Sequence, residues 1–227
     1  MKFFLLPILF LCSLLQAEDW EKRLFSAIKK QNWDEIKFAV ACFPNMEAID
    51  PDTGYTPLIA AIKTENRNLV KSFLDLRVNV NHKDKSGMTA LHHAISTGKA
   101  ELALLILDNP VRVDDTDTSG ATPIIYAIRY NLPEVVKLII TRGADINIRD
   151  NNGTTPLIYA TAQQNPKLVQ LLLEKGADKT AVDKFGNDAL KIAQKLGSQQ
   201  LIQILTQDKK GASSKPANDL QQLYLLK

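Results

Sequence analysis

A segment of 33 residues recurs along most of this chain. Its landmark glycine, Gly153, returns at the same spacing in four other copies, at Gly54, Gly87, Gly120 and Gly186. A repeat of this length is typical of a solenoid, in which one unit buries its apolar face only against the next unit. The repetition therefore restricts the chain to a stack of similar units.

Each copy contains the residues that begin and end two helices. In the copy at residues 150–182, Asp150 and Gly153 predict a tight turn in which the glycine takes positive φ. Thr155 is placed to cap a first helix, and Pro156 to occupy its first position. An apolar stripe at helical spacing predicts a second helix, which Gly176 ends in the left-handed conformation. Small residues recur where we expect neighbouring helices to approach closely: Ala61, Ala94, Ala127, Ala160 and Ala193.

Two copies depart from this pattern where the second helix ends. The glycine position holds Arg77 in one copy and Pro110 in the next. Because neither residue is a usual left-handed cap, we expect reshaped loops there, with Asn109 taking the left-handed conformation.

Several motifs of the copy at 150–182 resemble the ankyrin repeat: Thr155-Pro156-Leu157, Ala160, Leu168-Val169, Leu171-Leu172-Leu173 and Gly176-Ala177-Asp178. The resemblance covers residues 20–207 and implies an all-α solenoid of stacked helix-turn-helix units with β-turn or hairpin loops. We expect a capping helix pair at 18–50, repeats at 51–83, 84–116, 117–149 and 150–182, and a capping repeat at 183–208. Capping units carry the polar outer face that closes such a stack.

The first 17 residues have the composition of a secretory signal peptide. Lys2 precedes an apolar run over residues 3–15, which is too short to span a membrane, and the small Ala17 follows. We therefore predict an exported protein, periplasmic or secreted, similar to the signal-bearing ankyrin proteins of bacteria. The alternatives are an uncleaved anchor and a lipoprotein modified at Cys12. Cleavage leaves Cys42 without an internal disulfide partner, either as a partly buried helix residue or as a reactive thiol.

The last segment, residues 209–227, differs in composition from the repeats. Its first half, KKGASSKPAN, is typical of a flexible linker, and its second half, DLQQLYLLK, is rich in leucine. We expect this tail to be disordered or to dock on the last repeat, and the alternative is that it engages a partner.

Few residues are suited to chemistry. His92 and His93 are adjacent and therefore point about 100° apart on a helix, which prevents chelation of one metal ion. The resemblance implies that His92 instead ties neighbouring turns together. No phosphate-binding glycine loop, paired-cysteine motif or nucleophile elbow is present, so we predict no enzyme, no cofactor and no metal site. The 28 Lys and Arg are interspersed with 25 Asp and Glu, which argues against nucleic acid as a partner.

The resemblance implies that the protein binds a partner protein through the loop tips and the concave face of the first helices. Aromatic, Met and Arg side chains are enriched at interfaces. Five such residues are our candidates for partner contact: Tyr55, Met88, Arg129, Tyr130 and Phe185. Phe185 has the alternative role of sealing the terminal cap, and Tyr130 that of packing on a neighbouring helix. We expect a monomer in the absence of the partner, with no membrane span after signal cleavage. The alternative functions are an assembly subunit held by its C-terminal tail and a secreted host-directed effector.

Overall fold

The computed structural model describes residues 17–42 and 46–207 of the chain. Within these ranges it contains twelve helices and no strand, which confirms the predicted all-α solenoid. The helices are α2 (Ala17–Lys30), α3 (Trp33–Cys42), α4 (Pro57–Lys63), α5 (Arg67–Asp75), α6 (Ala90–Ser96), α7 (Ala100–Leu107), α8 (Pro123–Arg129), α9 (Pro133–Thr141), α10 (Pro156–Ala162), α11 (Pro166–Glu174), α12 (Ala189–Lys195) and α13 (Gln199–Thr206).

Some of the sequence predictions concern segments outside the described part of the chain. The predicted signal peptide up to residue 16, with Cys12, and the tail at 209–227 belong to those segments. The thiol of Cys42 is also outside it, because only the backbone of that residue is described. None of the helices in the described ranges has the length and hydropathy to cross a membrane.

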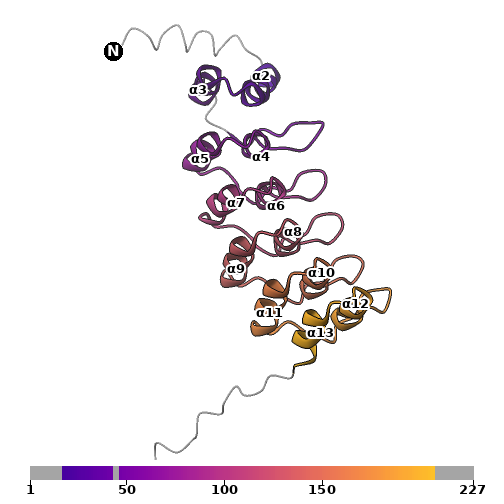
Figure 1. Ribbon diagram of the computed structural model, residues 1–227. Coiled ribbons are helices and arrows are strands. Elements are labelled where there is room, and N and C mark those ends of the chain that lie inside the picture. Colours follow the sequence, from indigo (N-terminus) through magenta and orange to yellow (C-terminus); the bar gives the residue numbers. More distant parts are fainter. Residues whose placement is uncertain (1–16, 43–45, 208–227) are drawn as a thin grey trace, which may run out of the picture.

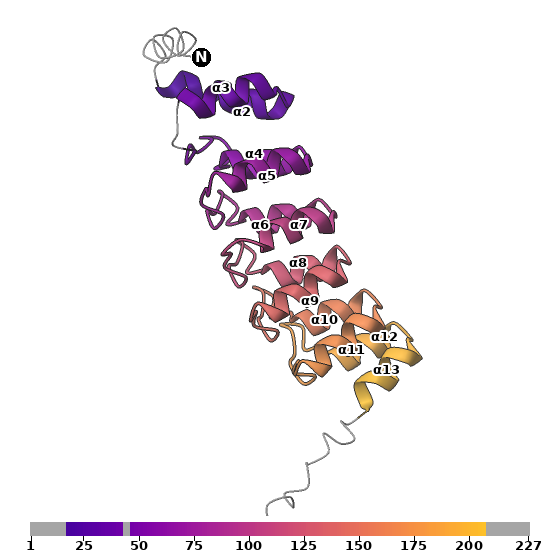
Figure 2. The ribbon, with the colours of Figure 1, turned by 90° about the vertical axis from the view of Figure 1, so that its left-hand side faces the viewer.

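The helices form six pairs that stack one on another (Figure 1). The first helices of the pairs, α2, α4, α6, α8, α10 and α12, lie in one layer, and the second helices lie in another. Turning the molecule by 90° shows the pairs following one another along an elongated stack (Figure 2). From α4 onward, a loop projects on the side of each first helix (Figure 1).

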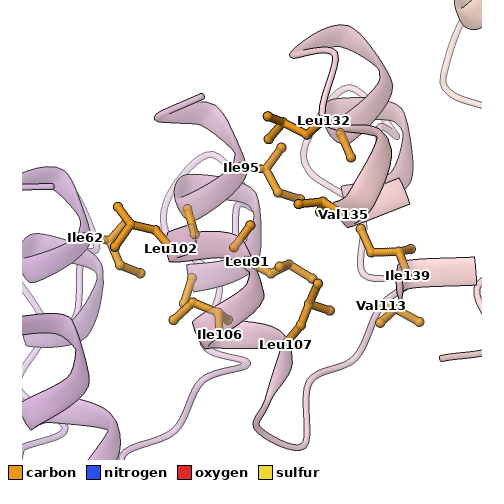
Figure 3. Close-up of a cluster of buried hydrophobic side chains, with 14 of the residues drawn as sticks. Ile62, Leu91, Ile95, Leu102, Ile106, Leu107, Val113, Leu132, Val135 and Ile139 are labelled. Carbon is orange, nitrogen blue, oxygen red and sulfur yellow. The ribbon is translucent and has the colours of Figure 1, made fainter. Parts of the chain in front are cut away.

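The core lies between consecutive pairs. Figure 3 shows Ile62 of α4 facing Leu102 of α7, and Ile95 of α6 facing Val135 of α9. All four side chains are fully buried, and burial of such a side chain contributes about 1.5–3 kcal/mol. The alanines predicted to lie at close helix contacts are completely buried in every copy: Ala61, Ala94, Ala127, Ala160 and Ala193.

The predicted caps begin several helices. The hydroxyl of Thr155 accepts a hydrogen bond from the backbone N–H of Ile158 at 3.3 Å, and Thr56 caps α4 in the same way. In the last pair the carboxylate of Asp188 replaces the threonine and accepts from Lys191 N–H at 2.7 Å. These bonds satisfy backbone donors that the first turn of a helix leaves unpaired.

The prediction of a left-handed Asn109 is wrong. No positive φ occurs at this residue, whereas Arg77 takes φ +56° at the equivalent exit of the preceding copy. The Asn109 amide donates to the Leu105 carbonyl at 3.0 Å, and the Asn109 carbonyl accepts from Val111 N–H at 2.8 Å. Asn109 thus ends α7 through side-chain and turn hydrogen bonds, so a left-handed residue is not needed there.

Left-handed residues also occur in the turn between the two helices of every pair, which the sequence analysis did not anticipate. Two of the six are glycines, and the others have side chains: Gln31, Glu65, Gly98, Asn131, Gln164 and Gly197. The turn closes by a backbone hydrogen bond, such as Gln164 N–H to the Thr161 carbonyl at 2.9 Å. A shared turn geometry therefore holds with four different residue types.

The hairpin loops stack directly on one another. Backbone N–H groups of each loop bond to carbonyls of the preceding loop, as in Asn151 to Ser119 at 2.9 Å and Lys184 to Asn152 at 2.8 Å. A β-carbon added at Gly120 would lie 2.8 Å from the Asn151 backbone nitrogen, closer than real contacts allow. At Gly186, in the last loop, the same addition would meet no atom within 4 Å.

These two glycines separate the effect of φ from the effect of close approach, because their φ values of +78° and +73° are nearly the same. We expect Gly186→Ala to lower the free energy of unfolding by about 1 kcal/mol through φ alone. Gly120→Ala must also push the next loop away, and we expect a loss of at least about 2 kcal/mol. Urea denaturation of the full chain measures both values. Equal losses would show that the loops do not pack as closely as described.

Candidate functional site

The surface predicted to bind a partner is built from two kinds of element. It comprises the first helices and the five hairpin loops that precede α4, α6, α8, α10 and α12, at residues 50–55, 84–88, 117–121, 150–154 and 183–187. We call this surface the inner face. Each loop is closed by a backbone bond, such as Asp117 N–H to the Ala121 carbonyl at 3.0 Å. These bonds therefore hold the tips of the loops in fixed positions.

One carboxylate organises each hairpin. In the third loop, the Oδ1 atom of Asp117 accepts bonds from the backbone N–H groups of Ser119 at 2.8 Å and Ala121 at 2.9 Å. Burial raises the pKa of the Asp117 carboxyl, but the hydrogen bonds from Ser119, Tyr126 and Ala121 together bring it below its ordinary value. The carboxylate is thus ionised, and its oxygens already accept hydrogen bonds. It is therefore a structural group and a poor general acid or base.

The second oxygen of the same carboxylates is bound by the following helix. The Tyr126 hydroxyl donates to Oδ2 of Asp117 at 2.7 Å, and the Tyr159 hydroxyl donates to Oδ2 of Asp150 at 2.7 Å. Burial and the neighbouring Asp150 raise the pKa of Tyr159 to about 12. These bonds fasten each hairpin to its helix. A shared spacing of nine residues could have revealed these pairs in the sequence, because it recurs in successive copies.

A histidine takes the tyrosine position one repeat earlier. His93 Nε2 lies 2.7 Å from Oδ2 of Asp84, and both side chains are buried. Burial lowers the pKa of His93, an effect that the neighbouring Asp84 opposes. The sequence analysis considered His93 only as a metal ligand. Within the described residues, no group of three or more His, Cys, Asp or Glu side chains is placed to hold a metal ion.

His92 has the structural role that the resemblance implied. Its Nδ1 atom accepts the backbone N–H of Thr89 at 3.2 Å, which places the proton on Nε2. Nε2 then faces the carbonyl of Ala121 in the next repeat at 3.3 Å. Complete burial lowers the pKa of His92 to about 4, so the ring is neutral at pH 7. One neutral side chain therefore ties two repeats together.

The structure places the five candidate residues at several points of the inner face. Arg129 and Tyr130 lie together at the end of α8 and are both exposed. Tyr55 and Met88 are half-buried in the first and second hairpins, where the Tyr55 ring meets the His93 ring edge-on at 5.0 Å. Phe185 is 79% exposed at the tip of the last hairpin, so it does not seal the core of the terminal cap.

The Arg129 side chain packs on Tyr126, which is itself bonded to the third hairpin. Its guanidinium lies 5.6 Å from the centre of the Tyr126 ring, a distance typical of a cation–π contact. Tyr126 is in turn held by Asp117, and the backbone carbonyl of Arg129 accepts from the Gln163 amide at 2.8 Å. Tyr130 beside it leaves 43% of its surface exposed. Arg129 is thus a preorganised cation in the middle of the stack, with the exposed Tyr130 beside it.

Comparison with protein-family models gives one family, described as ankyrin repeats in three copies. Its model matches residues 63–150, 99–183 and 134–219, which together cover more than half of the chain. A search of curated proteins gives no match.

The buried neutral His92 predicts that stability falls in mild acid. Its pKa of about 4 in the folded protein lies below the unfolded value of about 6.5, so the unfolded chain binds more protons between these values. We expect stability to be full above pH 7 and to fall by about 2 kcal/mol between pH 7.5 and pH 5. Thermal denaturation at several pH values measures this loss.

His92→Gln is the matched control, because it removes the titrating group from the same position. We expect this variant to be less stable than the wild type at pH 7.5 and to lose less stability on acidification. If the two proteins show the same change between pH 7.5 and pH 5, His92 is not the group responsible.

Proposed function

Because the chain belongs to the ankyrin-repeat family, whose repeats are generally protein–protein interaction modules, we propose that it binds a partner protein through its inner face. The observation that carries this proposal is the Arg129 and Tyr130 pair on α8. Both side chains are exposed, although arginine and tyrosine are among the residues that contribute most to interfaces.

The support beneath Arg129 favours binding. The Tyr126 ring under the Arg129 guanidinium is fixed by its hydrogen bond to Asp117. A side chain held in place before association loses less conformational entropy on binding than a mobile one. Arg129 is therefore suited to contact a partner at low entropic cost.

A catalytic role has little support on this surface. The hairpin carboxylates of Asp84, Asp117 and Asp150 accept hydrogen bonds on both oxygens from their own repeats. A general acid or base needs a side chain that is free to exchange a proton with a substrate. Ankyrin repeats are also generally non-catalytic modules, and we propose that this protein is not an enzyme.

Export from the cytoplasm is a second part of the proposal and depends on the sequence of residues 1–17 alone. The short apolar run after Lys2 and the small Ala17 support a cleaved signal. We expect sequencing of the mature protein from the envelope or medium of its cell to begin at Glu18. A mature chain that retains its first 17 residues would contradict cleavage.

We expect the double variant Arg129→Ala and Tyr130→Ala to weaken partner binding by at least tenfold, because truncation of an interface anchor costs about 2 kcal/mol or more. Crosslinking and pull-down identify the partner, and calorimetry then measures its affinity. The melting temperature should change by only a few degrees, since both side chains are exposed.

Two controls accompany this measurement. Glu134→Ala with Lys137→Ala changes two exposed residues on α9, in the other layer, and should leave the affinity unchanged. Truncation after Asp208 distinguishes the inner face from the C-terminal tail. Partner capture should survive the truncation, whereas its loss would favour an assembly subunit held by the tail.

A further inference from the structure

The N-terminal end of the inner face contains a groove that the sequence analysis did not anticipate. Its volume is about 640 Å³, and it lies between α2, the first hairpin and α4. Phe25, Tyr55 and Ala60 give it an apolar lining, while Lys29 and Lys63 border it with positive charge. Asp50 also lines the groove.

A substitution in the repeat pattern explains why this groove is open. The position that holds His93, Tyr126 and Tyr159 in the next three copies is occupied by Ala60 in this one. Each of the larger side chains reaches back to the carboxylate of its hairpin at 2.7 Å. The methyl group of alanine cannot do so, and the corner between helix and hairpin stays unfilled.

The carboxylate of this hairpin is correspondingly less occupied. The first hairpin is one residue longer than the others, with Asp50 N–H bonded to the Tyr55 carbonyl at 2.9 Å. Oδ1 of Asp50 accepts bonds from Asp52 and Thr53, but no described group donates to its Oδ2. Asp50, which lines the groove, thus has one carboxylate oxygen without a described donor, and this oxygen can accept an N–H from a ligand.

The two lysines at the border have unused charge. Lys29 and Lys63 are exposed, and neither forms an ion pair with a described carboxylate. Lys85 adds a third ammonium group beside the first hairpin, where it donates to the Pro51 carbonyl at 2.6 Å. A ligand carboxylate placed between Lys29 and Lys63 would therefore find two cationic donors without displacing an existing partner.

The undescribed segments of the chain itself are poor complements for this groove. Residues 1–16 contain one charged side chain, Lys2, and residues 43–45 contain none. Residues 208–227 contain one acidic–apolar pair, Asp219 and Leu220, but their four lysines against two aspartates make the segment net basic. The charge of the groove favours another chain as its occupant.

We propose that this groove binds an acidic segment of a partner protein, in which an Asp or Glu side chain lies beside an apolar one. The carboxylate contacts Lys29 and Lys63, the apolar side chain packs on Phe25, Tyr55 and Ala60, and a backbone N–H donates to Asp50. A peptide supplies these three groups together. The inference rests on the proposed function and extends it by giving the chemistry of the partner segment and where it binds.

The test selects random dodecapeptides by phage display against the full chain and measures their affinity by fluorescence anisotropy after synthesis with a fluorescein label. We expect the selected peptides to contain Asp or Glu next to Leu, Ile or Phe. Lys29→Glu with Lys63→Glu should weaken their binding by at least tenfold, because close charge pairs across an interface then repel. Binding should also weaken as salt is added, since exposed charges are screened.

Two further variants separate the groove from a general charge effect. Lys71→Glu with Lys137→Glu makes the same change in net charge on exposed residues of α5 and α9, and should leave affinity unchanged. Ala60→Tyr introduces the side chain that the third and fourth copies hold at this position, and it should block the groove while the melting temperature is kept. If this variant does not fold, Lys29→Glu with Lys63→Glu still tests whether the peptides bind the groove.

Several results would overturn the inference. They are the absence of any selected binder, a neutral or basic consensus, or acidic peptides that bind the groove variants as tightly as the wild type. Peptides weakened only by Arg129→Ala with Tyr130→Ala would place the site on α8, so the groove would be wrong while the proposed function stood. A natural partner that is insensitive to every inner-face variant would contradict the proposed function itself.

Discussion

The contact between consecutive helix pairs is the interaction on which the rest of this structure depends. A pair of short helices cannot bury its own apolar side chains, so residues such as Ile62 and Leu102 are covered only by a neighbour. The fully buried alanines, Ala127 among them, allow that neighbour to come close. Close stacking then brings the hairpins within hydrogen-bonding distance, and this explains why a β-carbon at Gly120 would collide with the next loop. The packing of the core and the regularity of the inner face thus have one cause.

The same stacking decides what the polar residues do. Asp117 orders its own turn through one oxygen and holds Tyr126 through the other, and His92 connects its repeat to the Ala121 carbonyl of the next. An unpaired buried polar group costs about 1–3 kcal/mol, and among the described side chains only His93 Nδ1 and Thr122 Oγ1 are buried without a partner. The carboxylates and imidazoles in these pairs are already hydrogen-bonded and are therefore not available for acid–base catalysis. The side chains left exposed on a stiff support, such as Arg129, are those suited to recognition.

Departures from the repeat pattern are where this protein acquires features of its own. Ala60 replaces the large side chain that fastens a hairpin to its helix in later copies, and the first hairpin gains a residue. Both changes lie at the groove, next to Lys29 and Lys63. A repeat protein tolerates such changes because each unit contacts only its neighbours, so the effect of a local change stays local. This is the physical reason for seeking specificity in the irregular copies.

The sequence by itself determined the period, the helix pairs and the caps at Thr56 and Thr155, because these depend on residues close together in the chain or on a spacing that every copy shares. The bridging role of His92 was implied by the family resemblance, and only the structure shows that Thr122 makes no side-chain cap bond. The tertiary structure decided the bonds of Asp84, Asp117 and Asp150 to His93, Tyr126 and Tyr159, which require a helix to turn back over its hairpin. It also decided the left-handed turns at residues such as Gln164, where the geometry of two packed helices overrides the preference for glycine. Asn109 was predicted wrongly because its amide found a carbonyl partner in the preceding turn of α7. The groove beside Ala60 could not be predicted from the sequence for a related reason. An empty space is defined by the elements around it, and no single segment encodes it.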